Sequence, residues 1–501
     1  MKKFIVVFVF SVITCKSFCQ QAPKNWYLLD DDKDHYPGIS LDKAYQTVKG
    51  KKSKTVIVAV IDSGIDSTHE DLKRVIWNNK NEKANGIDND KDGFTDDIHG
   101  WSFLGSAKGN IDHENTEMTR MVRMYRKTGD TLNDNYKKVN AEYKKAFDAA
   151  NTELKNVETY VRGLDTLRTH IGADSLTLDL VQKFKPESPE DKWYKERVLL
   201  VLKDGGSYAQ YRYKDIQGYY EHLQDQLSYD LNLDFDPRPL VGDDSNNPRE
   251  KNYGCPDFNG PGPLHGTHVS GIIAADRKNK VGIMGIADNV EILPLRAVPA
   301  GDERDKDIAA AIVFAADHGA KVINMSFGKG FSPDKQIVDD AVRYAMNKDV
   351  LMVHAAGNES LNVDSSDNFP NKYYLDKDAA GAWIEVGASS WNTKSIVASF
   401  SNYGMNQVDL FAPGVDIYST LPGSTYGSEN GTSMASPVVA GIAGLIREYY
   451  PQLTAVQVKE ILMQSVIPYT ELKTKCKSGG IVNAYKAMLL AKTTAADKHK
   501  R

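Results

Sequence analysis

Residues 54–64 have the sequence KTVIVAVIDSG, an unbroken apolar run rich in β-branched residues that stops at Asp62. A run without polar alternation is typical of a strand buried on both faces, as in a parallel sheet. Similar runs occupy residues 290–298 (VEILPLRAV), 320–328 (AKVINMSFG) and 349–358 (DVLMVHAAGN), and helical patterns at 305–320 and 334–349 separate them. Strands that alternate with helices predict an α/β fold with a doubly wound, mostly parallel sheet.

The chain has 501 residues, of which 41% are hydrophobic and 26% are charged, as in a soluble globular protein. A net charge of -5 and the lack of a basic run interleaved with aromatic residues argue against a nucleic-acid partner. We therefore do not expect nucleic acid to be a partner.

The first residues, MKKFIVVFVFSVITCKSFCQQ, place two lysines before a short apolar stretch and then small and polar residues. This pattern predicts a cleavable signal peptide over 1–19, and a secreted or periplasmic protein. A lipid anchor on Cys15 is the less favoured alternative, because Thr14 and Lys16 flank it poorly. No later stretch has the ~20 apolar residues that a membrane span needs.

The stretch 105–250 differs in composition from the rest of the chain. It is dense in Lys, Glu, Asp and Tyr, and from Tyr136 to Leu164 its apolar residues recur at spacings of three, four or seven. This period predicts a long amphipathic helix or a helical hairpin. SPEDKWYKERVLLVL predicts another helix, with Ser188 as its cap and Pro189 in its first turn. We therefore predict a helical insertion into the α/β domain.

Three short stretches combine small residues with one reactive side chain. They are VIDSGID around Asp62, GPLHGTHVSGIIAA around His265 and NGTSMASPVVAG around Ser433. Singly, each has an ordinary structural explanation, because aspartate and serine often cap helices or form turns and a histidine can pack in a core. We expect His268, one helical turn after His265, to be such a packed histidine. A zinc-protease helix is disfavoured, because no glutamate lies between or just after the two histidines.

Taken in order, the three stretches resemble those of the subtilisin-like serine proteases (subtilases, peptidase family S8), which place Asp, His and Ser in this order along the chain. The resemblance covers residues 51–104 and 251–490 and extends to VINMSFG, HAAGN and APGVDIYSTLPG. It implies a catalytic triad of Asp62, His265 and Ser433. The chemistry agrees, because a serine hydroxyl needs an imidazole base, and the imidazole needs a carboxylate to orient it.

The same resemblance implies further site residues and an activity. Asn358 would supply the side chain of the oxyanion hole, next to the backbone N–H of Ser433 at a helix N-terminus. The substrate-binding residues would be Ser326, Phe327, Gly328, Ala356 and Gly357, with an extended substrate paired to the backbone there. The implied function is a serine endopeptidase that cleaves proteins or peptides through an acyl-enzyme, with no cofactor in catalysis.

Residues 85–97, NGIDNDKDGFTDD, predict a second site. Asp88, Asp90 and Asp92 occupy alternate positions and are followed by Gly93, Phe94 and Asp96. This spacing turns several oxygen ligands inward on a tight loop, as calcium coordination requires. The likeness to an EF-hand is partial, because His99 occupies the position of its last glutamate. We predict a structural calcium ion bound by Asp88, Asp90, Asp92, Phe94 and Asp96, with an acidic exposed turn as the alternative.

These observations predict the organisation of the whole chain: signal peptide 1–19, short N-terminal extension 20–50, protease domain 51–104 and 251–490, helical insertion 105–250 and polar tail 491–501. The insertion separates two triad residues, so we expect it to lie near the cleft as a lid, as a docking surface for substrates or as a partner-binding arm. The alternative function is a catalytically idle scaffold that binds partners through this insertion. A disulfide between Cys255 and Cys476 is an open possibility in an oxidising compartment.

Overall fold

The computed structural model describes residues 22–244 and 247–498, so the predicted signal peptide lies outside the described residues. The chain divides into a main unit, which contains Ala22–Val139 and Leu233–Arg501, and a helical unit, which contains Asn140–Asn232. The predicted insertion, 105–250, is therefore shared between the two units. Within the described ranges, no helix combines the length and apolar composition that a membrane crossing requires.

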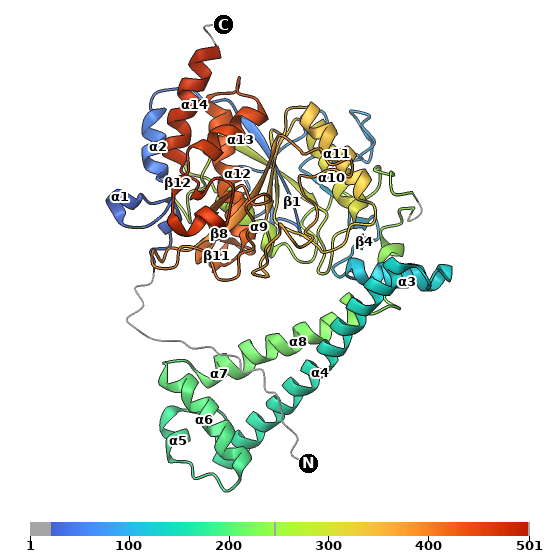
Figure 1. The fold of residues 1–501 in the computed structure, drawn as a ribbon, viewed down its shortest axis with the longest axis vertical. Coiled ribbons are helices and arrows are strands. Elements are labelled where there is room, and N and C mark those ends of the chain that lie inside the picture. The colour runs from blue at the N-terminus through green and yellow to red at the C-terminus, as the bar shows by residue number, and fades with distance from the viewer. Residues whose placement is uncertain (1–21, 245–246, 499–501) are drawn as a thin grey trace. The chain divides into compact units, whose positions relative to one another are not determined.

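A nine-stranded sheet forms the centre of the main unit, in the order β12-β13-β9-β8-β7-β6-β1-β5-β2 (Figure 1). All neighbours are parallel except β12 and β13, which confirms the predicted fold class. The strands are β1 Val56–Asp62, β2 Trp101–Ser102, β5 Val290–Arg296, β6 Val322–Met325, β7 Leu351–Ala355, β8 Trp383–Ser389, β9 Leu410–Pro413, β12 Ile467–Pro468 and β13 Gly480–Ile481. Two hairpins accompany it: β3 Gly105–Ser106 with β4 Gly109–Asn110, and β10 Ile417–Leu421 with β11 Thr425–Glu429.

Helices cover both faces of this sheet (Figure 1). The alternation of side chains along β1 shows the two layers: Val58 and Val60 pack in one core with α9 and α12, whereas Ala59 and Ile61 pack in another with α10 and α11. Both faces of β1 are buried, as its unbroken apolar sequence predicts. The helices of the main unit are α1 Asp31–Asp34, α2 Leu41–Thr47, α3 Glu117–Thr128, α9 Leu264–Ala274, α10 Asp305–Asp317, α11 Lys335–Asn347, α12 Thr432–Tyr449, α13 Ala455–Gln464 and α14 Ala484–Lys498.

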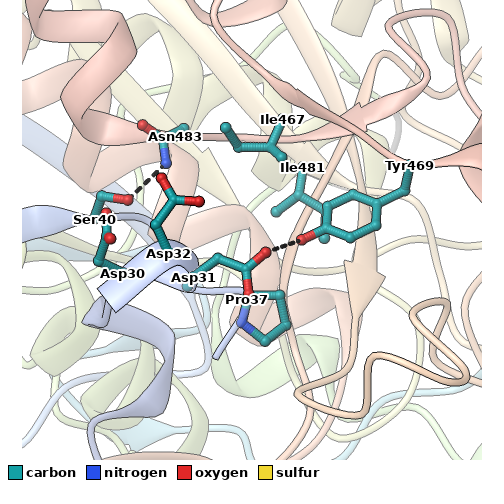
Figure 2. A pocket seen from close by; sticks show the side chains of 10 residues that line it. Asp30, Asp31, Asp32, Pro37, Ser40, Ile467, Tyr469, Ile481 and Asn483 are labelled. Carbon is teal, nitrogen blue, oxygen red and sulfur yellow. Dashed lines mark hydrogen bonds between the residues drawn. The ribbon is translucent and has the colours of Figure 1, made fainter. Parts of the chain in front are cut away.

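The segment 22–50 is an integral part of the main unit. Trp26 and Leu41 are fully buried members of the core that contains α12 and α14. Figure 2 shows a pocket where this segment meets the C-terminal strands, and there Tyr469 donates a hydrogen bond to Asp31 Oδ2 at 3.1 Å. The residues that line this pocket include none of the predicted site residues.

The helical unit contains most of α4 Asp134–Ile171, followed by α5 Leu178–Lys183, α6 Pro189–Lys203, α7 Tyr208–Gln210 and α8 Gln217–Asp225, with π-helical turns at Tyr211–Ile216 and Gln226–Asp230. The long helix and the α6 cap agree with the sequence patterns, since Ser188 Oγ accepts the backbone N–H of Asp191 at 3.0 Å. A small core that includes Leu164, Val181 and Val198 holds α4, α5 and α6 together.

The two cysteines of the described chain do not form the disulfide considered above. Cys255 and Cys476 are both buried free thiols. Cys255 pairs with β2 at one edge of the sheet, whereas Cys476 packs beside β9 and β13 near the other edge. Six strand spacings between β2 and β9 amount to roughly 29 Å, far beyond the reach of a disulfide.

Candidate active site

Asp62 and His265 meet at the carboxyl end of β1. Asp62 is the last residue of β1 and is buried, and His265 lies in the first turn of α9. His265 Nδ1 donates a hydrogen bond to Asp62 Oδ1 at 2.8 Å, and the N–H of Ser63 donates to the same oxygen at 2.7 Å. A carboxylate can only accept, so the proton is on Nδ1 and the Nε2 lone pair is free to act as a base.

The local sequence allows this contact, and the contact changes the pKa of the histidine. A side chain at Gly266 would lie 2.2 Å from the carbonyl oxygen of Gly64, so only glycine lets α9 approach β1 so closely. Burial of the ring opposes protonation, but the charge and hydrogen bond of Asp62, together with the charge of Glu429, outweigh it and raise the pKa of His265 above its ordinary value of 6.5. His268, by contrast, is fully buried, and burial lowers its pKa to about 4, as expected for a packed histidine.

Ser433 lies in the first turn of α12, where its backbone N–H has no partner within the helix. Pro437 follows four residues later and has no N–H to donate to the carbonyl of Ser433. The hydroxyl of Ser326 replaces that donor, at 3.0 Å from Ser433 O. Ser433 Oγ itself donates to the carbonyl of Ser326 at 3.1 Å. The side chain of Ser326, predicted to bind substrate, is therefore used to hold the start of α12.

Asn358 follows β7 and faces the start of α12. Its Oδ1 accepts the backbone N–H of Thr432 at 2.9 Å, and because an N–H can only donate, this bond fixes the orientation of the amide. The Nδ2 donor consequently faces the other way. A side chain at Gly431 would begin 3.5 Å from the N atom of Ser433 and 3.6 Å from Asn358 Nδ2. Glycine at this position leaves open the space in front of both donors.

The predicted substrate-binding residues form two sides of one small region. The amide of Asn368 donates to the carbonyl of Ala356 at 3.2 Å, and its Oδ1 would lie 2.6 Å from a side chain at Gly328. Asn368 therefore links the predicted substrate-binding residues Gly328 and Ala356. Phe327 packs against the core beneath α10 and α11, and Gly357 donates its N–H to Thr432 Oγ1 at 3.0 Å. The sequence pattern includes Thr432 in the motif around Ser433 but gives it no role of its own. Asn368 begins the segment 368–373, which the sequence favours for the base of the specificity pocket without assigning a residue.

The acidic loop, residues 82–97, brings together more carboxylates than the sequence pattern indicated. Oxygens of Asp88, Asp90 and Asp92 lie within 4.8 Å of one another, and so do those of Glu82, Asp90 and Asp97. Asp90 Oδ1 is buried and accepts no hydrogen bond from the described residues. Burial, and then the neighbouring charges of Asp97 and Asp90, raise the pKa of Asp92 to about 6, although the imidazole of His318 opposes the rise.

Asp96 and Phe94, two of the predicted ligands, use their side chains for other contacts in the structure. Asp96 is not in either carboxylate group, because its oxygens accept the backbone N–H groups of Asn85 and Gly86 at 2.9–3.1 Å. The side chain of Phe94 is buried against Trp101 and Phe314, so only its backbone carbonyl could face a cation. Glu82 and Asp97, which the sequence pattern did not include, have carboxylate oxygens within 4.8 Å of that of Asp90. The adjacent residues Asp96 and Asp97 indicate in the sequence that a carboxylate is available here. Neighbouring side chains point in different directions, however, and the sequence does not say which of the two faces the other carboxylates.

Comparisons with known proteins agree with this geometry. The family model described as "Subtilase family" matches residues 53–487. The chain is 41% identical over 225 residues to a thermophilic serine proteinase of Bacillus sp. (strain AK1), which covers 45% of this chain and 52% of that protein. It is 39% identical over 222 residues to subtilisin BL of Lederbergia lenta, covering 44% of this chain and 76% of that protein. The chain thus spans about half the length of the first relative.

A solved structure of a protease has a fold similar to that of this chain. It is described as a protease from Pseudoalteromonas arctica PAMC 21717 and aligns with a TM-score of 0.50 and 22% identity over 93% of this chain and 97% of that chain. At this identity the likeness concerns the fold. Because the family model spans most of the sequence, including all three motif stretches, the chain belongs to the subtilase family.

Proposed function

We propose that the protein is a secreted serine endopeptidase that hydrolyses proteins or peptides through an acyl-enzyme on Ser433. The observation that supports this most directly is the 2.8 Å hydrogen bond between His265 and Asp62, which are 203 positions apart in the chain. This bond holds the ring with its proton on Nδ1, so that Nε2 can act as the base. Secretion is supported by the leader-like sequence of residues 1–19.

In the proposed reaction, the same groups act first in acylation and then in deacylation. Ser433 Oγ turns from the carbonyl of Ser326 to His265, gives its proton to Nε2 and attacks the scissile carbonyl carbon. The resulting oxyanion accepts hydrogen bonds from Asn358 Nδ2 and the N–H of Ser433. His265 then transfers the proton to the leaving amine and an acyl-enzyme forms. Water, deprotonated by the same nitrogen, attacks the ester, and the proton returns to Ser433 as the product acid leaves.

The substrate strand would pair with the backbone of residues 326–328, and Asn368 would contribute to the floor of the pocket for the residue whose carbonyl is attacked. Its amide nitrogen donates to Ala356, and Asn368 Oδ1 lies 2.6 Å from where a side chain at Gly328 would begin, so this oxygen would be the group that meets the substrate. We propose docking of large substrates or of a partner on the insertion as a further role of residues 105–250.

We also propose that the acidic loop binds structural calcium. A buried oxygen of Asp90 that accepts no hydrogen bond from the described residues fits such a role, and so does the set of carboxylates from Glu82, Asp88, Asp92 and Asp97. Hard oxygen ligands suit calcium. The ion would neutralise the mutual repulsion of these side chains and take no part in bond cleavage.

A serine-directed fluorophosphonate tests the proposed activity. The full chain should be labelled at Ser433, and Ser433→Ala should not be labelled while it melts at nearly the same temperature. A properly folded parent chain that stays unlabelled would refute the proposal and favour the idle scaffold. The measurement is the intact mass of each protein after treatment, with thermal unfolding as the control for folding.

A further inference from the structure

Lys329 directly follows the predicted substrate-binding residues, and both its backbone and its side chain are fixed. Its N–H and carbonyl exchange two hydrogen bonds of 2.9 Å with Phe369. Its side chain is only 1% exposed, and Nζ donates to Glu117 Oε2 at 2.9 Å and to the carbonyl of Glu303 at 2.7 Å, and lies 2.8 Å from Asp305 Oδ1. An ammonium group has three protons, so all of them are used.

Glu117 belongs to residues 114–120, here called the first stem, which lie in the main unit and precede the helical unit along the chain. Its carboxylate also pairs with Arg120 at 2.6 Å, and Arg120 donates to the carbonyls of Asp302 and Glu303 at 2.9 and 3.1 Å. Burial opposes the charge of Glu117, but the charges of Arg120 and then Lys329 outweigh it and lower the pKa of Glu117. Burial also opposes the charge of Lys329, but the neighbouring carboxylates, first that of Glu117, outweigh it and raise the pKa of Lys329. The first stem is therefore tied by a buried ion pair to the residue that ends the substrate segment.

The second stem, residues 238–243, is anchored by a cluster of the same kind in a different place. Asp243 pairs with Arg238 at 2.6 Å and with Lys306 at 2.6 Å, and Arg238 also pairs with Asp307 in the first turn of α10. All four side chains are buried or nearly so. Among the described residues, the hydrogen bonds and ion pairs of Asp243 do not reach residues 326–329. Asp243 is thus a matched counterpart of Glu117, without the link to the substrate segment.

We propose that Lys329, held by Glu117, is a positioning residue that fixes the register of residues 326–328 for the incoming substrate strand. A substrate residue that pairs with residues 326–328 would form hydrogen bonds to the N–H and C=O groups of this segment. Such hydrogen bonds weaken steeply when they are bent or stretched, so they depend on where the segment is held. A long substrate uses several of these bonds and a single-residue ester uses almost none. The first stem would then contribute to substrate binding. This inference rests on the proposed endopeptidase function.

The test compares Glu117→Gln with Asp243→Asn in the full chain. Each change neutralises one buried stem carboxylate that bridges an arginine and a lysine, so each should lower the melting temperature. Two substrates are used: a peptide anilide with four residues on the acyl side and a single-residue ester. We expect Glu117→Gln to lower the ratio of kcat/KM for the peptide to that for the ester by about tenfold, mainly through KM, as expected for the loss of one or two hydrogen bonds. Asp243→Asn should keep the ratio of the parent.

Glu117→Gln alone leaves the charge of Lys329 buried without this partner, which could disturb folding. A second variant therefore serves as a control. Lys329→Met with Glu117→Gln removes the charge pair as a unit and should lower the same ratio. If the ratio is unchanged in a folded variant, or falls equally in Asp243→Asn, the stem has only a structural role and the inference is wrong. Fluorophosphonate labelling of the parent separates this outcome from a failure of the proposed function, in which the parent would not react at all.

Discussion

The Asp62–His265 pair and the acidic loop are both built on buried carboxylates, but they differ in the partners that the chain supplies. Asp62 Oδ1 accepts from one imidazole and one backbone N–H. In the loop, carboxylates of Glu82, Asp90 and Asp97 face one another within 4.8 Å. A carboxylate paired with a donor orients that donor, whereas carboxylates that face one another repel and favour a shared cation. The first arrangement suits catalysis and the second suits metal-dependent stability.

Replacing Asp62 is the most severe test of this comparison. In Asp62→Asn, the amide would donate to Nδ1 of His265 and place the ring proton on Nε2, where it cannot accept the proton of Ser433. We expect kcat to fall about 10⁴-fold with little change in melting temperature. The measurement is steady-state hydrolysis of a peptide anilide.

The pH dependence of the parent and of Asp62→Asn adds a second readout to the same experiment. The base must be neutral, and the pKa of His265 is raised, so kcat/KM of the parent should fall as the pH drops through a midpoint above 6.5. Without the Asp62 carboxylate, only the charge of Glu429 opposes the effect of burial on the pKa of His265, so the midpoint should move below the parent's. A variant with the parent's rate and midpoint would mean that Asp62 does not orient His265.

The oxyanion donor should give the next largest effect. Asn358→Ala removes the Nδ2 group beside the N–H of Ser433, and we expect kcat to fall about 10²- to 10³-fold while KM changes little. Thr432→Val is the matched control, because it keeps the backbone N–H that holds Asn358 and removes only the hydroxyl. Its loss should be much smaller. Equal losses in the two variants would indicate a packing role for Asn358.

The sequence predicts the elements that depend on local pattern. The apolar run before Asp62 forms β1, and the cap at Ser188 begins α6, because burial on both faces and a capping side chain are encoded within a few residues. It also predicts the identity of the triad candidates, through motifs with a characteristic order. The contact of His265 with Asp62 follows from that order and is realised in the structure.

Other site features depend on residues that are distant in sequence. The orientation of Asn358 is set by Thr432, 74 positions later, and no local pattern records it. Lys329, in a Gly-Lys-Gly sequence, has the composition of an exposed loop, yet it is buried because oxygens from residues 117, 303 and 305 surround its ammonium group. The sequence likewise cannot select Asp97 over Asp96, since that choice depends on which carboxylate the backbone of residues 85 and 86 engages.

Removal of the proposed calcium ion should have the smallest effect on the activity of the protein. An ion that binds only the folded protein stabilises it by mass action, so chelation should lower the melting temperature by about 5 °C. The hydrogen bond between Asp62 and His265 does not involve this loop, so the rate of fluorophosphonate labelling at 25 °C should be nearly unchanged. Asp90→Asn should abolish the response to chelation. Asp96→Asn should retain it, because the Asp96 carboxylate of the parent accepts backbone N–H groups instead of facing the other carboxylates. If Asp96→Asn loses the response together with Asp90→Asn, the ion is bound by the set that the EF-hand spacing predicts, and the inward-facing group of Glu82, Asp90 and Asp97 is only a charged cluster. If Asp90→Asn keeps the response, the proposed calcium site in this loop is wrong.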